Sequence, residues 1–196
     1  AIGFGSLNSD TLGSKSVAIG EQTLNAQNFT TATDSKNTAV GYEAGKAVTT
    51  GVKNTLIGTT SGTSLTDADL NTAVGFDALA SDTLGSRSVA IGKSTLNAQN
   101  FTTATDTYNT AVGYHAGLAV TTGIQNTIIG GLAGDALTDS DFHVAVGYNA
   151  LGTNTVGDKS TAVGFAALGT LNHSTTTDVQ NTAVGYQAAT SMTTGV

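Results

Sequence analysis

The chain has 196 residues, of which only 11% are charged, 25 are glycine and none is proline, cysteine or tryptophan; its formal net charge is −7. The seven basic residues are scattered, which argues against a nucleic-acid partner. No apolar run approaches the roughly 20 residues of a membrane-spanning helix, and the lack of cysteine excludes disulfides and thiolate metal sites. We therefore expect a thin core of small residues held by continuous backbone hydrogen bonds.

A five-residue box, usually Asn-Thr-Ala-Val-Gly or Ser-Val-Ala-Ile-Gly, recurs along the whole chain. Its last residue is a glycine, which we take as structural, at Gly3, Gly20, Gly41, Gly58, Gly75, Gly92, Gly113, Gly130, Gly147, Gly164 and Gly185. The numbers of these glycines rise in steps of 17, except for steps of 21 before Gly41, Gly113 and Gly185. Such periods are typical of solenoids.

The spacing predicts one repeat domain over residues 1–196. Four turns form a super-repeat with a period of 72 positions, covering 4–75, 76–147 and, in part, 148–196. Because the chain opens and closes inside a repeat, we expect a fragment of a longer fibre. The predicted fold is all-β, a solenoid of about eleven turns in the two lengths, 17 and 21, that the glycine steps define.

Each box predicts a short strand. In residues 37–41, Thr38 and Val40 face one side, Ala39 and Gly41 face the other, and neither side carries a charge. A strand that is neutral on both faces is buried on both faces. We therefore expect a second buried surface outside the coil, most simply the axis of an oligomer.

The residues around the box predict further columns along the solenoid. An aromatic residue, a variable residue and a small residue commonly follow the box, and we expect a second strand there. Stacked strands would align the first box residues, so that asparagine amides bond along the stack. The two columns consist of Phe4, Tyr42, Phe76, Tyr114, Tyr148, Phe165 and Tyr186, and of Asn37, Asn54, Asn71, Asn109, Asn126 and Asn181.

The lengthened turns give the candidate receptor contacts. The same residues recur 72 positions apart, as Asn25, Gln27, Asn28 and Phe29 and as Asn97, Gln99, Asn100 and Phe101. Amides and an exposed ring suit carbohydrate or protein contact. Alternatively, both phenylalanines tuck inward and fill the space that the four extra residues create. In the third copy, we align residues 171–174 with 25–28.

These boxes carry a family resemblance. Residues 16–20 and 88–92, Ser-Val-Ala-Ile-Gly, resemble the β-roll of trimeric autotransporter adhesin heads, whose turns are usually shorter. Residues 37–42, 109–114 and 181–186, Asn-Thr-Ala-Val-Gly-Tyr, are similar to repeats of phage-type tail fibres. The resemblance implies a left-handed parallel β-roll, a side-by-side homotrimer, an extracellular place on a virion or cell surface, and contact with a host glycan or protein.

The ionisable residues form no recognisable catalytic or cofactor motif. His115, His143 and His173 lack partners at fixed spacing, so we expect them to be solvated. The remaining candidates are the acidic pairs Asp67/Asp69 and Asp139/Asp141 and the turn residues Asp10, Asp34, Asp82 and Asp106. The pairs could share calcium or simply form solvated turns, whereas the turn residues lack the cleft that a two-carboxylate glycosidase needs. We expect no enzyme, cofactor or metal.

Three functions remain, the last of which is a calcium-dependent roll that chelation would unfold. The first is a structural and adhesive fibre segment, the shaft or head of a tail fibre or surface adhesin, which extends and presents a receptor-binding surface. The second is a monomeric surface- or ice-binding solenoid that uses a threonine column with a spacing of about 4.8 Å. That column contains Thr38, Thr55, Thr72, Thr110, Thr127 and Thr182, and it alternates with Val17, Val89 and Val144.

Overall fold

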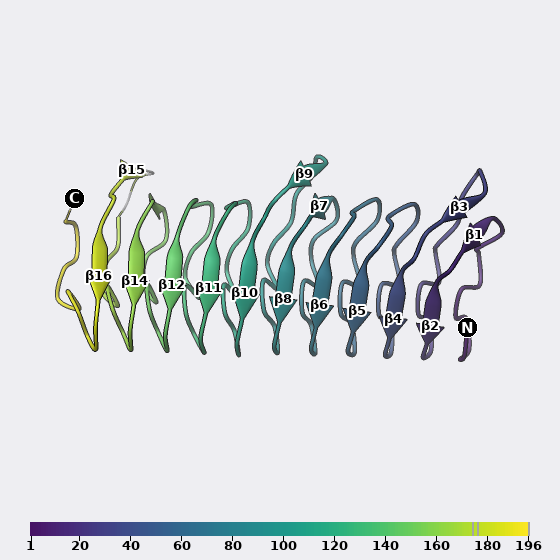
Figure 1. Ribbon diagram of the computed structural model, residues 1–196, viewed down its shortest axis with the longest axis horizontal. Coiled ribbons are helices and arrows are strands. Elements are labelled where there is room, and N and C mark those ends of the chain that lie inside the picture. Colours follow the sequence, from purple (N-terminus) through teal and green to yellow (C-terminus); the bar gives the residue numbers. More distant parts are fainter. Residues whose placement is uncertain (174, 176, 196) are drawn as a thin grey trace.

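The computed structural model describes residues 1–173, 175 and 177–195, which form a rod of stacked coils (Figure 1). Ten box strands make one parallel sheet along the rod, in the order β16-β14-β12-β11-β10-β8-β6-β5-β4-β2. These strands are β2 (Val17–Ile19), β4 (Thr38–Val40), β5 (Thr55–Ile57), β6 (Thr72–Val74), β8 (Val89–Ile91), β10 (Thr110–Val112), β11 (Thr127–Ile129), β12 (Val144–Val146), β14 (Thr161–Val163) and β16 (Thr182–Val184). The predicted all-β solenoid is confirmed.

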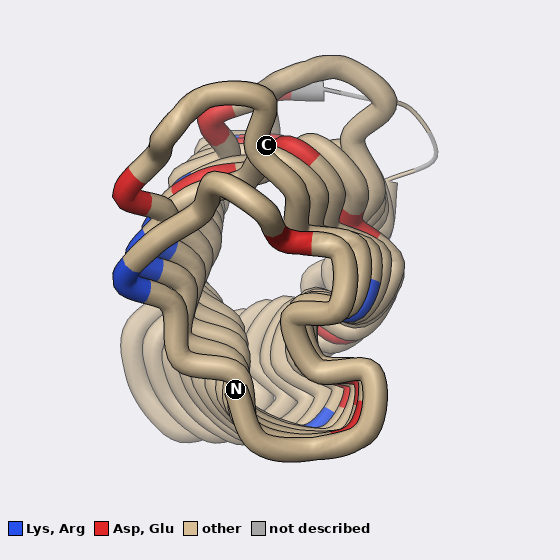
Figure 2. Tube along the Cα trace, turned by 90° about the vertical axis from the view of Figure 1, so that its right-hand side faces the viewer, with Lys and Arg blue, Asp and Glu red and all other residues tan. Residues whose placement is uncertain are grey.

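Successive boxes pair in strict register. Ala39 lies beside Leu56 in the centre of the neighbouring box, and the same box positions meet at every junction of the sheet. Ile2 bridges to Ile19, which adds the eleventh box to the stack. Seen from the N-terminal end, the chain runs counterclockwise as it recedes (Figure 2), so the solenoid is left-handed.

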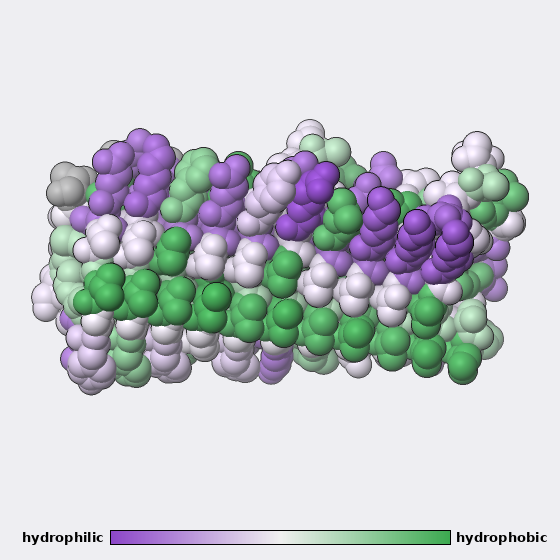
Figure 3. All heavy atoms as spheres, in the orientation of Figure 1, coloured by the Kyte–Doolittle hydropathy of each residue, from purple (hydrophilic) through white to green (hydrophobic). Residues whose placement is uncertain are grey.

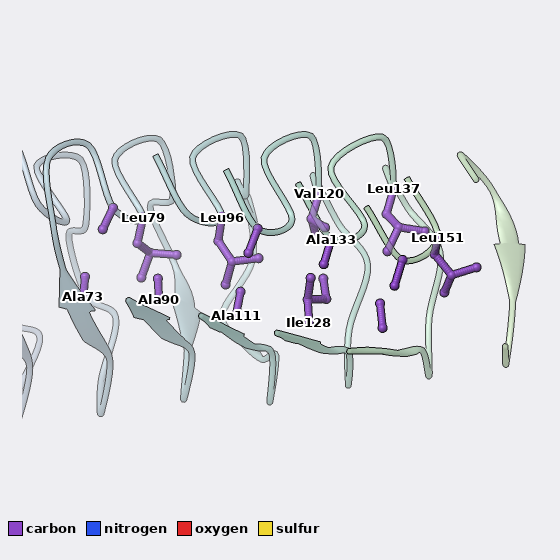
Figure 4. Close-up of a cluster of buried hydrophobic side chains, with 14 of the residues drawn as sticks. Ala73, Leu79, Ala90, Leu96, Ala111, Val120, Ile128, Ala133, Leu137 and Leu151 are labelled. Atoms are coloured by element: carbon purple, nitrogen blue, oxygen red, sulfur yellow. The ribbon is translucent and has the colours of Figure 1, made fainter. Parts of the chain in front are cut away.

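The core is a narrow column inside the coils (Figure 4). The central residue of each box strand points inward and is buried, and residues of the facing wall meet it. Their volumes compensate: the large Leu56 fills the space beside two glycines, since a Cβ on Gly45 or Gly62 would lie 2.6 or 2.7 Å from its methyl groups. A large residue on one wall thus faces small residues on the other, so that the core of each coil is filled although the coils are equal in size.

The expected second strand after each box is absent, and a wall of turns takes its place. Left-handed residues recur there, such as Gln22 and Leu24 with φ of 55° and 48°. The amide of Gln22 donates to Phe4 in the preceding coil at 2.8 Å, whereas that of Leu24 donates to Ala44 in the following coil at 3.1 Å. This alternation joins the coils in both directions without extended backbone.

Among the described residues, second strands occur only beside the lengthened turns, which stand out from the rod (Figure 1). There, three two-stranded parallel sheets pair β1 with β3, β7 with β9 and β13 with β15. Their bounds are Gly13–Ser14, Thr33–Asp34, Gly85–Ser86, Thr105–Asp106, Gly157–Asp158 and Thr177–Asp178. The super-repeat is therefore visible as a regular protrusion every fourth coil.

Two features require glycine at the end of each box: a left-handed backbone and the close approach of the next coil. Gly41 has a φ of 137°, and a Cβ there would lie 2.5 Å from the carbonyl oxygen of Gly58 in the next coil. The other box glycines up to Gly164 meet the next glycine carbonyl in the same way, at 2.2–2.6 Å. A side chain at these positions would force neighbouring coils apart.

The alignment of the third copy needs a shift of two residues. Thr155 donates its hydroxyl to the Oδ1 of Asn172 at 2.9 Å, as Thr11 does to Asn28 at 3.0 Å and Thr83 to Asn100 at 3.1 Å. Asn172 therefore corresponds to Asn28 rather than to the alanine at position 26. By the same register, residues 171 and 173 occupy the places of glutamine and phenylalanine in the first two copies, and position 174 lies outside the described residues.

Candidate binding surfaces

The lengthened turns bury half of the residues that the sequence predicted as receptor contacts. Phe29 and Phe101 are only 5% and 7% exposed, so the inward packing of the rings is confirmed. Gln27 and Gln99 are fully buried, contrary to the expectation of a binding loop. Four of the eight candidates are thus unavailable to a partner.

The asparagines of these turns divide into two kinds. Asn25 and Asn97 are half-buried, and their Nδ2 groups donate to the carbonyls of residues 5 and 77 at 2.8 and 3.1 Å. Asn28 and Asn100 are exposed. These last two are the most accessible of the eight candidates.

The buried glutamines belong to an interior polar network. Gln99 donates through Nε2 to Asp82 at 2.6 Å, and its Oε1 accepts from Asn109 at 2.9 Å. The second oxygen of Asp82 accepts from the amides of Gly85 and Phe101, both at 3.1 Å. Asp82 is fully buried, so it does not lie on an exposed turn tip as expected.

The predicted asparagine ladder exists, and it bonds to the backbone. The Oδ1 of Asn54 accepts from the amide of Asn71 in the next coil at 2.9 Å, while its Nδ2 donates to the carbonyl of Ala68 at 2.7 Å. The pattern repeats along the corner and satisfies buried backbone groups that the sheet leaves free.

His143 lies in this ladder and not in solvent. It occupies the place of Asn71 in the preceding super-repeat and is buried. Its Nδ1 accepts from the amide of Ser160 at 3.2 Å, and its Nε2 has no hydrogen-bond partner in the described structure. His173 is also buried, whereas His115 is partly exposed. The alignment of His143 with Asn71 could have predicted its place in the ladder, but the expectation of a solvated residue considered only the lack of motif partners.

We expect His143 to make the rod sensitive to acid. Burial lowers the pKa of its imidazole below the ordinary 6.5, against the weaker pull of the Asp158 charge. As the pH falls through 6.5, the unfolded chain therefore binds a proton that the folded chain does not. Stability should fall by up to about 1.4 kcal/mol per pH unit until the folded pKa is reached, and it should be unaffected above that window.

Urea unfolding of the His143→Asn variant at several pH values measures this effect. The variant should match the wild type at pH 8 and lose less stability between pH 7 and pH 5, since asparagine suits the ladder. His115→Asn is the control for the same substitution at a partly exposed histidine outside the ladder. Equal acid losses in the wild type and His143→Asn would contradict the assignment.

Three of the four paired acids bind the preceding coil, whereas Asp139 accepts from the hydroxyl of the adjacent Thr138 at 3.2 Å. Asp69 and Asp141 accept from the amides of Val52 and Ile124, both at 2.7 Å, and Asp67 accepts from the hydroxyl of Thr50 at 2.5 Å. Within the described residues, no group of three or more histidine or acidic side chains could hold a metal ion. The geometry gives these acids a structural use.

Charges of both signs gather along one corner of the coil (Figure 2). Lys15 pairs with Asp34, and the equivalent pairs of the next two super-repeats are Arg87–Asp106 and Lys159–Asp178, at 2.5–2.9 Å. These side chains are 40–61% exposed, so each pair contributes little to stability. One such pair occurs in each super-repeat. The described part of the chain shows no cleft at Asp34 or Asp106.

The outer face of the ten-stranded sheet is uncharged. The last residue of each box strand, the fourth position of the box, belongs to a continuous column of branched aliphatic side chains, visible as a band along the rod (Figure 3). The column consists of Ile19, Val40, Ile57, Val74, Ile91, Val112, Ile129, Val146, Val163 and Val184. The isoleucines remain 38–40% exposed in the single chain. Beside this column runs the outward-facing Thr and Val column, which is formed by the first residue of each box strand, the second position of the box.

An aromatic column follows the box glycines. The rings of Tyr148 and Phe165 stack at 5.5 Å, and those of Phe165 and Tyr186 at 5.3 Å. Where the column is interrupted, the ammonium group of Lys93 lies 5.9 Å from the ring of Phe76 and 5.7 Å from that of Tyr114. These exposed rings extend the apolar surface of the sheet.

The described residues enclose no pocket, and they contain no helix long and apolar enough to cross a membrane. Comparison of the chain with protein families, curated proteins and solved structures finds no match.

Proposed function

We propose that the chain is a structural and adhesive fibre segment in which three copies pack side by side. The segment extends a tail fibre or surface adhesin outside the cell and presents a receptor-binding surface to a host glycan or protein. It carries no catalytic site of its own. The partner surfaces are the outer walls of the rod, and the sheet face forms the trimer axis.

The uncharged outer sheet face carries this proposal. Ten box strands supply an aliphatic column over about 43 Å, at about 4.8 Å between neighbouring strands. Extended exposed apolar surfaces mark interaction sites in soluble proteins. The column repeats in register along the rod, so identical parallel rods can match it over their full length around a three-fold axis.

A charge on this face should dissociate the trimer without unfolding the coil. Ile91→Lys places three ammonium groups at the axis, where each uncompensated charge costs roughly 3–5 kcal/mol. The side chain is 38% exposed in the single chain, so the circular dichroism of the variant should be unchanged. Its mass in solution should fall from three chain masses to one.

The wild-type segment should be prepared with a trimerising cap, which limits fraying of the coils, and measured after the cap is removed. Phe142→Lys is the matched control because this exposed side chain lies outside the sheet strands, in a column that already contains Lys36 and Lys53. It should remain trimeric. A trimer that survives Ile91→Lys would contradict the proposed axis.

The threonine column supports a second candidate, a monomeric solenoid that binds ice or another ordered surface. Thr38 and its equivalents point outward from the parallel sheet in register, as a lattice-matching surface requires. A stable, folded wild-type monomer whose thermal hysteresis is lost in Thr127→Lys would favour this function over the fibre.

A further inference from the structure

Three of the 14 asparagines begin an Asn-x-Ser/Thr sequence, the acceptor pattern for N-linked sugars. They are Asn28-Phe29-Thr30, Asn100-Phe101-Thr102 and Asn172-His173-Ser174, at intervals of 72 positions. A threonine-rich chain contains such patterns by chance, so their number alone carries little weight. Their placement in the structure is more informative.

In the first two copies, the acceptor groups face solvent. Asn28 and Thr30 are exposed on either side of the buried Phe29, and residues 100–102 repeat this alternation. The Oδ1 of Asn28 is held by the hydroxyl of Thr11 at 3.0 Å, and its backbone amide donates to Thr49 at 3.0 Å. No described residue accepts a hydrogen bond from its Nδ2, which is the group that would carry the sugar.

The third copy keeps the pattern while its neighbours change. Asn25 and Gln27 are replaced by glycine and leucine at residues 169 and 171, but Asn172 is exposed and remains bound by Thr155 at 2.9 Å. That hydrogen bond explains why the asparagine is kept. It does not explain the hydroxyl residue two positions later, because Thr30 and Thr102 make no hydrogen bond through their side chains in the described structure.

We propose that Asn28, Asn100 and Asn172 are acceptor sites for N-linked sugars on the folded rod. In the reaction, the Nδ2 of asparagine attacks C1 of a sugar activated as a nucleotide diphosphate. The N–C1 bond forms, the bond from C1 to the phosphate oxygen breaks, and the nucleotide diphosphate leaves with its electron pair. The proton from Nδ2 passes to a base of the glycosyltransferase.

The sites would place sugars in one row along the rod. They are four coils apart, or about 19 Å at about 4.8 Å per coil, on the lengthened turns that stand out from the rod (Figure 1). A sugar there leaves the aliphatic column of the sheet uncovered. The proposal therefore does not depend on the oligomeric state.

The test uses the folded chain, UDP-glucose and a soluble asparagine glucosyltransferase that is first shown to modify a free peptide of residues 25–32. Intact mass spectrometry should show up to three added hexoses, and peptide mapping should assign them to the three sites. Asn100→Gln and Thr102→Ala should each remove one hexose. Asn8→Gln, an exposed asparagine outside the pattern, should remove none.

Thr102→Ala is the decisive variant because it leaves Asn100 exposed and unchanged. Loss of its hexose shows that the enzyme reads the three-residue pattern in the folded rod. A folded chain that takes no sugar while the peptide is fully modified would overturn the proposal. Unchanged modification of Thr102→Ala would overturn it as well.

Discussion

Gly130→Ala is expected to divide the rod into two blocks that unfold separately. The glycine has a φ of 137°, and an added Cβ would lie 2.5 Å from the carbonyl oxygen of Gly147. Left-handed strain and forced separation of the coils together cost roughly 2–6 kcal/mol. Because each coil contacts only its neighbours, the damage concentrates at the junction between β11 and β12.

Hydrogen exchange of the amides in β11 and β12 measures this effect, together with the melting profile. The adjacent Gly131→Ala is the matched control, since its Cβ would meet nothing closer than the ring of Tyr148 at 3.6 Å and its backbone is not left-handed. It should be neutral or slightly stabilising.

A second control separates strain from collision. Gly185 has a φ of 131°, but a Cβ there would meet only the Cβ of Ala188, at 3.9 Å. Gly185→Ala should therefore lose only the roughly 1–3 kcal/mol of backbone strain. Equal exchange in Gly130→Ala and Gly131→Ala would contradict the close approach between coils.

The period of the box was sufficient to predict the sheet, because the same box residues pair with one another in every pair of neighbouring coils. Ala39 and Leu56 occupy equivalent places in successive coils. From this equivalence follow the parallel register of the strands, the inward direction of the central box residue and the stacking of the asparagines at one corner of the coil. The outward Val and Ile positions were equally predictable from the absence of charge on either face. The trimer and the fibre that we inferred from them remain predictions.

The wall after the box could not be predicted from residue preferences. Its left-handed positions hold residues such as Gln22, Glu43 and Leu96, which rarely adopt that backbone on their own. Hydrogen bonds between coils impose it, and these are properties of the stack rather than of the segment. The same applies to His143 and Asp82, which are buried because of their place in the coil.

Gln99→Leu is expected to destabilise the second super-repeat by roughly 2–4 kcal/mol. The substitution removes the Nε2 donor that lies 2.6 Å from Asp82 and leaves a fully buried carboxyl oxygen without a partner. Asn109 also loses one acceptor, although its bond to the carbonyl of Gly123 at 2.7 Å remains. Packing alone cannot offset these losses, because leucine is similar in volume and adds no donor.

The third super-repeat has a different pair of residues at these two positions. In the places of Asp82 and Gln99 it has Asn154 and Leu171, and Asn154 satisfies itself locally by donating to the carbonyl of Gly157 at 2.8 Å. An amide therefore suits a neighbour without hydrogen-bonding groups, whereas a carboxyl group needs a donor. The two positions should behave as a coupled pair.

The double variant Asp82→Asn/Gln99→Leu tests the coupling. Asp82→Asn alone should also destabilise, because its Nδ2 would face the Nε2 of Gln99. The double variant should recover roughly 1–3 kcal/mol relative to the sum of the single changes. Urea unfolding, with hydrogen exchange at residues 85 and 101, measures the cycle. Strictly additive losses would show that Asp82 and Gln99 are independent and that the Asn–Leu pair of the third copy is not a compensated exchange.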